Sequence, residues 1–410
     1  MRFKFHSGVT GAIFYSGANF LCAFSLQFKV DPVEFGGYAF ALILVQFGLS
    51  LSNASLGSPL VVAISENPQN RAEIYASFFK ICLIMIAVLL PFFVLSLWAA
   101  GLAQSVIVWG VFYASILWLR WYLRAIFLAD FKSQQCAMMD IIYGVICAFG
   151  TLVLIWWGKV TVQTALAVMG VAALLSVLQA AKVLWVYLRH GMRAKMSLWR
   201  ASFVRHGKWA LLGVSTAEIT ANAHAYCLTL FLGPAAYAPV ASLALFFRPT
   251  PILIQTVTQY ERPRLAQLFV AGEHGQWRRF AFKIDSSLAG AAALNGLGVA
   301  GLILFAPQWI GGGAYDALFL WPLAALLGVT QITRALRTGA SAALQASGEF
   351  RALATRTLIA APLSLGASLA ALIWYPNPLI GVLIAVLWAE AILCVIILRC
   401  AYFTNRKGQT

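Results

Sequence analysis

A single arginine, Arg248, lies in the middle of an apolar stretch of the chain that reads FFRPTPIL. An ionisable side chain costs ~2.5–3.5 kcal/mol at the centre of a lipid bilayer by insertion scales, so an arginine at such a position is a candidate functional group. Pro249 and Pro251 follow it and cannot donate backbone hydrogen bonds, which predicts a broken helix beside the guanidinium. A guanidinium stays charged and can hold a phosphate through two hydrogen bonds, so the pattern predicts an anion site. The alternative is an arginine that pairs with a neighbouring acid for packing alone.

An acidic residue lies in the preceding apolar stretch. Glu218 shares one predicted helical face with Ser215, Asn222 and Tyr226, which follow the spacing i, i+3, i+7 and i+11. A carboxylate away from water can take up a proton, or it can balance the charge of Arg248. A structural ion pair is the alternative interpretation of Glu218.

Uncharged polar side chains lie along two apolar stretches near the start of the chain. The first carries Tyr15, Asn19 and Cys22, and the second carries Gln46, Ser50 and Asn53. Side-chain amides on neighbouring spans predict a hydrated cleft that binds sugar hydroxyl groups, although small polar side chains also hold membrane helices together. The residues expected to contact a substrate, beside Arg248, are Asn19, Gln46, Asn53, Asn222 and Tyr226.

Other ionisable residues near apolar stretches have less specific patterns. Arg120 and Arg124 lie one helical turn apart and could meet an anionic headgroup, but such a pair is more often a charge anchor on the cytoplasmic side. Asp285 and Arg334 lie near predicted cytoplasmic ends, and we expect them to extend towards the membrane surface. Glu390, in LWAEAILC, has no polar stripe around it and receives no role.

The composition places these residues in a membrane. Of 410 residues, 61% are hydrophobic and only 10% are charged, against roughly 25% charged in an average soluble domain. That balance excludes a cytosolic enzyme, a disordered chain and a nucleic-acid-binding protein, despite the net charge of +16. Walker, HExxH and GxSxG patterns do not occur, so we expect neither an enzyme nor a cofactor or metal site.

Apolar stretches long enough to cross a bilayer recur along the whole chain. They predict about twelve transmembrane helices, at residues 8–28, 36–64, 75–99, 104–123, 139–157, 162–187, 209–231, 237–258, 282–306, 317–336, 355–375 and 379–400. With the N-terminus in the cytoplasm, 27 of the 29 lysines and arginines fall at cytoplasmic ends and loops, although one of these, Arg248, itself sits within a span; only Lys29 and Lys159 fall outside. This asymmetry predicts cytoplasmic N- and C-termini.

The chain divides at its longest basic segment. We predict an N-terminal six-helix bundle at 1–188, a basic cytoplasmic linker at 189–208, a C-terminal six-helix bundle at 209–402 and a cytoplasmic tail at 403–410. The linker is predicted either to be an interfacial amphipathic helix or to be solvated. Pro32 and Pro234, at an offset of 202 residues, each precede an aromatic residue by three positions, which favours a parallel repeat of the two halves.

Three segments resemble one family of membrane proteins. DPVEFGGYAFALILVQFGLSLSNASLGSPLVV (31–62) resembles its first two spans, and YAPVASLALFFRPTPILIQTVTQYERPRLAQL (237–268) resembles its eighth span with a mid-helix arginine. ALQASGEFRA (343–352) resembles its turn between spans 10 and 11. The family is that of the bacterial polysaccharide and O-antigen flippases, within the multidrug/oligosaccharidyl-lipid/polysaccharide (MOP) exporter superfamily.

The resemblance implies an all-α polytopic protein with two six-helix bundles around a central cleft. It implies a flippase that moves an undecaprenyl-diphosphate-linked oligosaccharide across the bacterial inner membrane by alternating access, for O-antigen, capsule or exopolysaccharide synthesis. A polysaccharide polymerase and export complex would then be its protein partners. The first two spans depart from related lipid-linked precursor flippases because they lack deep cations, which leaves more weight on Arg248. The alternatives are a multidrug or organic-cation exporter of the same superfamily, a membrane polysaccharide polymerase or ligase, and a structural subunit of an export complex.

Overall fold

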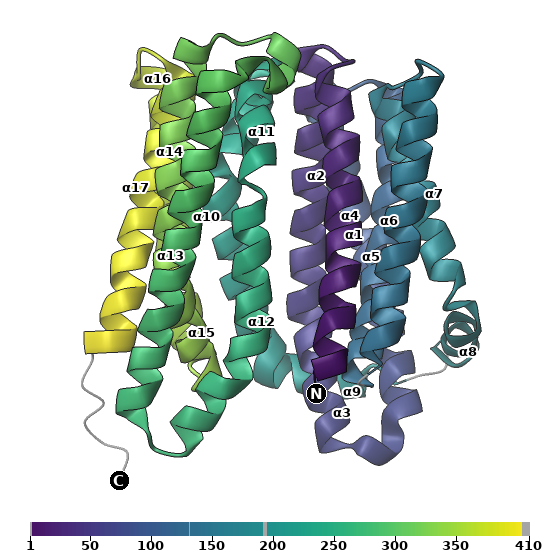
Figure 1. Ribbon diagram of the computed structural model, residues 1–410. Coiled ribbons are helices and arrows are strands. Elements are labelled where there is room, and N and C mark those ends of the chain that lie inside the picture. Colours follow the sequence, from purple (N-terminus) through teal and green to yellow (C-terminus); the bar gives the residue numbers. More distant parts are fainter. Residues whose placement is uncertain (1, 131, 192–194, 404–410) are drawn as a thin grey trace. The chain divides into compact units, whose positions relative to one another are not determined.

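The computed structural model describes residues 2–130, 132–191 and 195–403, and every regular element in these ranges is a helix (Figure 1). Eight of the described helices are long and apolar enough to cross a membrane, and a bent pair makes a ninth. The prediction of an all-α polytopic membrane protein is therefore confirmed. The chain forms two compact units: unit 1 is Met1–Leu211 with Gly233–Ala235, and unit 2 is Leu212–Leu232 with Ala236–Thr410.

Unit 1 contains the first six predicted spans. Its elements are α1 (Arg2–Gln27), α2 (Pro32–Ser52), a π-helical turn η1 (Asn53–Gly57), α3 (Ser58–Glu66), a 3₁₀ turn η2 (Pro68–Asn70), α4 (Arg71–Ala99), α5 (Gln104–Ala129), α6 (Ser133–Trp156), α7 (Val162–Leu178), α8 (Ala181–Gly191), α9 (Ser197–Ser202) and a π-helical turn η3 (Phe203–Gly207). The predicted span 162–187 is wrong in length, because α7 ends at Leu178. The amphipathic helix α8 then begins separately, with Lys182 and Trp185 exposed.

Unit 2 contains the other six predicted spans, from within α10 onward. The elements are α10 (Lys208–Leu232), α11 (Pro234–Phe247), α12 (Pro249–Val270), α13 (His274–Phe305), 3₁₀ turns η4 (Pro307–Trp309) and η5 (Gly311–Gly313), α14 (Ala317–Leu336), α15 (Thr338–Ala346), α16 (Phe350–Trp374), α17 (Pro378–Leu398) and a π-helical turn η6 (Arg399–Phe403). Of the predicted tail 403–410, residues 404–410 lie outside the described residues.

Proline marks the start of a helix at both positions of the suspected repeat. α2 begins at Pro32 and α11 at Pro234. Proline suits the first turn of a helix because its missing N–H would have no partner there. Asp31 caps α2 by accepting a 2.8 Å hydrogen bond from the backbone N–H of Glu34.

Two glycines allow α1 and α6 to pack closely within unit 1. A Cβ atom on Gly11 would lie 2.9 Å from the Cα of Ala137, and one on Gly144 would lie 2.6 Å from the carbonyl oxygen of Phe14. Real Cβ atoms do not approach other atoms so closely. Small residues at helix contacts are typical of membrane bundles, where close backbone approach replaces the hydrophobic driving force.

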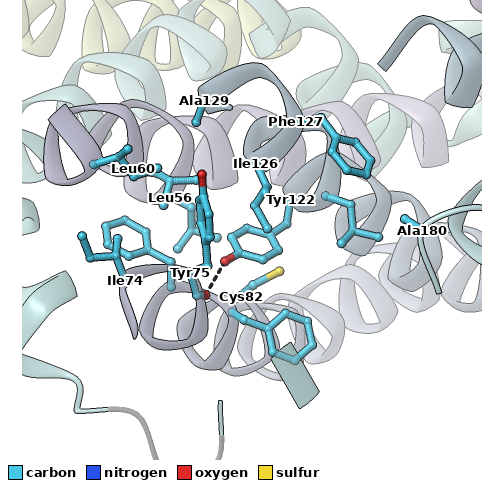
Figure 2. Packing of buried hydrophobic residues seen from close by; sticks show 14 of the residues in the cluster. Leu56, Leu60, Ile74, Tyr75, Cys82, Tyr122, Ile126, Phe127, Ala129 and Ala180 are labelled. Carbon is cyan, nitrogen blue, oxygen red and sulfur yellow. Dashed lines mark hydrogen bonds between the residues drawn. The ribbon is translucent and has the colours of Figure 1, made fainter. Parts of the chain in front are cut away.

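An aromatic core cluster joins α3, α4 and α5 in unit 1 (Figure 2). Tyr75 and Tyr122 lie side by side in it, and the hydroxyl of Tyr122 donates a 2.6 Å hydrogen bond to the carbonyl of Tyr75. The described part of the linker packs against the same region. Trp199 is partly buried against this cluster, and its Nε1–H donates to the carbonyl of Ser55 at 3.1 Å. Trp199 is therefore packed rather than solvated, while linker residues 192–194 lie outside the described residues.

Candidate functional site

Arg248 lies at the break predicted from its two prolines. It precedes α12 directly, and the axes of α11 and α12 differ by 53°. The side chain is half-buried, and no carboxylate among the described residues forms an ion pair with it. Arg248 is therefore an unneutralised cation beside an interrupted helix.

A side chain from α13 supports this break. The Nδ2 atom of Asn295 donates a 3.1 Å hydrogen bond to the carbonyl oxygen of Phe246. The Oδ1 atom of Asn295 and the hydroxyl of Thr250 are buried and have no hydrogen-bond partner among the described residues. Buried polar atoms are normally paired, so these two are candidate ligand contacts at the break. The sequence does not predict a role for Asn295, which lies 49 residues from Phe246 in the chain, or for Thr250, which is a single hydroxyl between Pro249 and Pro251.

Glu218 and Asn222 lie on one face of α10, as the spacing predicts. The Nδ2 atom of Asn222 donates to the Oε2 atom of Glu218 at 3.0 Å and to the Glu218 carbonyl at 3.2 Å. Glu218 and Tyr226 are both half-buried. The role of Glu218 as a counter-charge to Arg248 or as a proton carrier stays a prediction.

The amide residues of α1 and α2 have different surroundings. Asn19 uses both ends of its amide, because Nδ2 donates to the Tyr15 carbonyl at 2.9 Å and Oδ1 accepts from the Tyr143 hydroxyl at 2.8 Å. Gln46 and Asn53 are exposed, and Asn53 begins the π-helical turn η1. π-Helical turns inside helices often occur at functional sites. Contacts from these amides to a sugar remain predictions.

The pair Arg120 and Arg124 on α5 shares one carboxylate of α6. The Nη2 atom of Arg120 lies 2.6 Å from Oδ1 of Asp140, and the Nη2 atom of Arg124 lies 3.1 Å from Oδ2. Nε of Arg120 also donates to the Ser176 hydroxyl at 2.9 Å. The headgroup contact predicted for the two arginines is still a prediction, and the structure adds a buried partner that the sequence analysis did not name.

Aromatic rings complete the surroundings of Arg120. Its guanidinium carbon lies 5.1 Å from the ring centres of both Tyr15 and Tyr143. A desolvated cation over an aromatic face is stabilised by the ring quadrupole, by about 2 kcal/mol or more. Tyr143 is the residue that donates to Asn19, so the arginine cluster and the polar side chain of α1 form one network.

Unit 2 holds a second cluster of two arginines and one carboxylate. Nε of Arg334 lies 2.9 Å from Oε1 of Glu390, and Nη2 of Arg337 lies 2.8 Å from Oε2. Arg334 also donates to the carbonyl of Ala221 on α10 at 2.8 Å. The prediction that Arg334 extends to the membrane surface is wrong, because the fully buried Glu390 provides a counter-ion inside the bundle.

The corresponding prediction for Asp285 is also wrong. Asp285 is buried, and its carboxylate accepts hydrogen bonds from the backbone N–H groups of Gly339 and Ala340 and from the Tyr402 hydroxyl. Gly339 and Ala340 belong to the first turn of α15, where unpaired N–H groups and the helix dipole favour a negative charge. Asp285 therefore stabilises the start of α15.

Both clusters carry more positive than negative charge. In each, two arginines share one carboxylate, so the cluster has a formal charge of +1. The Nε–H groups of Arg124 and Arg337 are buried and have no acceptor among the residues that the structure describes. An anion near either cluster would therefore meet both an excess charge and an unused donor.

The fold has close counterparts among solved transporter structures. An inward-facing multidrug resistance MATE family transporter of the MOP superfamily matches with a TM-score of 0.71 and 14% identity, covering 94% of this chain and 92% of its own. The lipid II flippase MurJ, in an inward closed conformation, matches with a TM-score of 0.66 and 12% identity over 97% and 86% of the two chains. A MOP superfamily transporter from Pyrococcus furiosus, described as having a binding pocket of reversed polarity, matches with a TM-score of 0.63 and 14% identity over 97% and 93%.

These similarities show that the chain has the fold of the MOP superfamily transporters. No protein-family profile and no curated protein sequence matches the chain. The prediction of a MOP fold is thus confirmed, and membership of the polysaccharide flippase family remains a prediction.

Proposed function

We propose that the protein is a transporter that moves an undecaprenyl-diphosphate-linked oligosaccharide across the bacterial inner membrane for polysaccharide synthesis. In this proposal Arg248 binds the diphosphate, and Asn222 and Tyr226 contact the sugar. Glu218 balances the charge of Arg248 or carries a proton. The structural neighbour MurJ is also named for a lipid cargo, lipid II.

Arg248 is the observation that carries the proposal. An arginine that has no carboxylate partner among the described residues, beside a broken membrane helix, supplies positive charge where lipid cannot, which suits a diphosphate. The break also leaves Thr250 and Asn295 with unused polar atoms. The two arginine clusters add positive charge, because in each of them two arginines share one carboxylate. This excess favours an anionic over a cationic cargo.

A multidrug or organic-cation exporter is the second candidate, and the similar MATE structure supports it equally. Glu218 is the observation that favours it, because it places a half-buried carboxylate within a membrane helix, where it accepts a hydrogen bond from Asn222. A cation exporter would depend on Glu218 rather than on Arg248.

The two candidates can be separated in proteoliposomes. We would measure movement between leaflets of a fluorescent polyprenyl-diphosphate oligosaccharide by chemical quenching from one side, and efflux of ethidium in parallel. For a flippase we expect Arg248→Ala, at the same protein level as wild type, to abolish the movement of the fluorescent lipid between leaflets that quenching detects. Arg248→Lys should fail like Arg248→Ala if two-point phosphate binding is needed, because lysine offers only a point charge.

The matched acidic variant is Glu218→Gln. Ethidium efflux that Glu218→Gln abolishes and Arg248→Ala preserves would favour the exporter. Unchanged movement of the diphosphate lipid in Arg248→Ala would overturn the flippase proposal. Polyprenyl monophosphate provides the cargo control, since it has the same lipid and lacks the second phosphate.

A further inference from the structure

Unit 2 contains a cavity of ≈ 440 Å³ at one end of its bundle. Its lining residues come from α13, α14, α17 and η6, and they are Arg278, Arg279, Phe282, Asp285, Leu336, Leu398 and Tyr402. The basic ends of α13 and α17 are the ends predicted to lie at the cytoplasmic surface. The cavity therefore opens at the depth where lipid headgroups meet acyl chains.

Part of the cavity lining is apolar. Phe282, Leu336 and Leu398 supply hydrocarbon surface, and the side chain of Phe282 is exposed. The polar atoms of Asp285 are already used, because its carboxylate accepts from two backbone N–H groups of α15 and from the Tyr402 hydroxyl. The apolar part of the lining therefore suits a hydrocarbon chain rather than a polar molecule.

The cavity lining also contains two positively charged side chains. Arg278 and Arg279 are adjacent on the first turns of α13, and neither forms an ion pair with a carboxylate among the described residues. The Nε–H of Arg278 is buried and has no acceptor in the described part of the chain. Two guanidinium groups with a free donor suit a phosphate group.

We propose that this cavity is a binding site for an anionic phospholipid. The phosphate lies against Arg278 and Arg279, and one acyl chain lies along Phe282, Leu336 and Leu398. Basic pockets between membrane helices on the cytoplasmic side are suited to such lipids, because the headgroup supplies the anion and the bilayer supplies the chain. The site is separate from Arg248 and does not depend on the identity of the transported molecule.

The test uses full-length protein reconstituted in vesicles that contain a trace of phosphatidylglycerol with a photoreactive group on its acyl chain. After illumination, cross-linked peptides are identified by mass spectrometry. We expect labelling of the peptides that contain Phe282, Leu336 or Leu398. Phosphatidylcholine with the same photoreactive chain should label them at least about tenfold less, since the arginines select a net negative headgroup.

Two kinds of variant separate the charge from the cavity. Arg278→Gln with Arg279→Gln should reduce labelling by about tenfold or more, whereas Arg278→Lys with Arg279→Lys should retain most of it. Leu336→Trp fills the apolar part without changing a charge and should also suppress labelling. The matched control is Lys182→Gln with Arg200→Gln, which removes two exposed basic side chains from unit 1 and should leave labelling unchanged.

Several results would overturn the site. Equal labelling by phosphatidylcholine would mean that the cavity holds any lipid, and an equal loss in the control variant would mean that general surface charge attracts the probe. Unchanged labelling in Leu336→Trp would show that the acyl chain does not lie in the cavity. If the double glutamine variant fails to fold, two variants still test the site: the double lysine variant should retain labelling, and Leu336→Trp should suppress it. Thermal unfolding shows whether each variant is folded. Transport of the diphosphate lipid is measured on the same samples, so failure of the proposed function stays distinguishable from failure of the lipid site.

Discussion

Arg120 and Asp140 form an ion pair in which both side chains are only 2% exposed and Nη2 lies 2.6 Å from Oδ1. The chain also contains an exposed counterpart, because Arg71 lies 3.6 Å from Asp130 with its side chain 47% exposed. Water can replace the partner of an exposed charge, but nothing replaces the partner of a buried one. The two pairs therefore allow the same substitution to be compared at two depths.

Replacing Asp140 by asparagine should be strongly destabilising. Asp140→Asn leaves Arg120 and Arg124 without a counter-ion, and breaking a buried pair typically costs about 3–5 kcal/mol. The control Asp130→Asn should lose at most about 1 kcal/mol, because its partners Arg71 and Lys132 are exposed and an asparagine oxygen can still accept from the Tyr75 hydroxyl. Thermal unfolding in detergent measures both. Similar losses for the two variants would contradict the buried cluster.

The second arginine cluster makes an equivalent prediction with glutamates. Glu390→Gln removes the charge that Arg334 and Arg337 share, so we expect a loss of about 3–5 kcal/mol. Glu218→Gln should cost about 1 kcal/mol or less, because a glutamine oxygen still accepts from Asn222. Resistance to proteolysis in detergent gives the order of stability. A larger effect at Glu218 would show that the second cluster contributes little.

The contact between α1 and α6 can be tested at Gly144. Gly144→Ala would place a methyl group 2.6 Å from the Phe14 carbonyl, and overpacking of this kind costs about 1–3 kcal/mol. Gly298→Ala, on α13, is the control because nothing lies within 4 Å of the added Cβ. It should be neutral or slightly stabilising. Equal unfolding temperatures for Gly144→Ala and wild type would contradict the close packing.

The broken helix at Arg248 depends on Asn295. Asn295→Leu removes the donor to the Phe246 carbonyl, and the loss of one hydrogen bond typically costs about 0.5–1.5 kcal/mol. Asn295→Asp keeps an oxygen but no N–H, so it should behave like Asn295→Leu in this respect. Hydrogen exchange around residues 244–252 should increase in both variants. Unchanged exchange would mean that the prolines alone maintain the break.

Local patterns in the sequence predict local features of the structure well. Pro249 and Pro251 predict the break beside Arg248, and the face shared by Glu218 and Asn222 appears as a hydrogen bond between them. These predictions succeed because proline geometry and helical spacing act within a few residues. The predicted spans also coincide with helical segments, although 36–64 comprises α2, η1 and α3, 162–187 is divided between α7 and α8, and 237–258 is divided between α11 and α12.

The buried ion pairs could not be predicted in the same way. Glu390 lies 56 residues from Arg334, and the sequence contains nothing that joins them. From the sequence, only the distance of Arg334 and Asp285 from a span end is known. Residues at that distance commonly extend to the membrane surface, so the sequence predicts the same for these two. Their actual partners, Glu390 and the start of α15, are brought together by packing between helices. A charge near a span end is thus ambiguous until the neighbouring helices are known.

The order of residues in the second arginine cluster has a consequence for biosynthesis. Arg334 and Arg337 leave the ribosome more than fifty residues before Glu390, which belongs to α17. Until α17 is inserted, Arg334 in α14 and Arg337 directly after it have no counter-ion from Glu390, at ~2.5 kcal/mol or more for each one that lies deep in the lipid. In unit 1 the delay is much shorter, because Asp140 follows Arg120 by 20 residues. A nascent chain stopped before α17 would therefore expose a poorly inserted α14 to membrane quality control, whereas the first bundle can assemble as soon as its own helices are made.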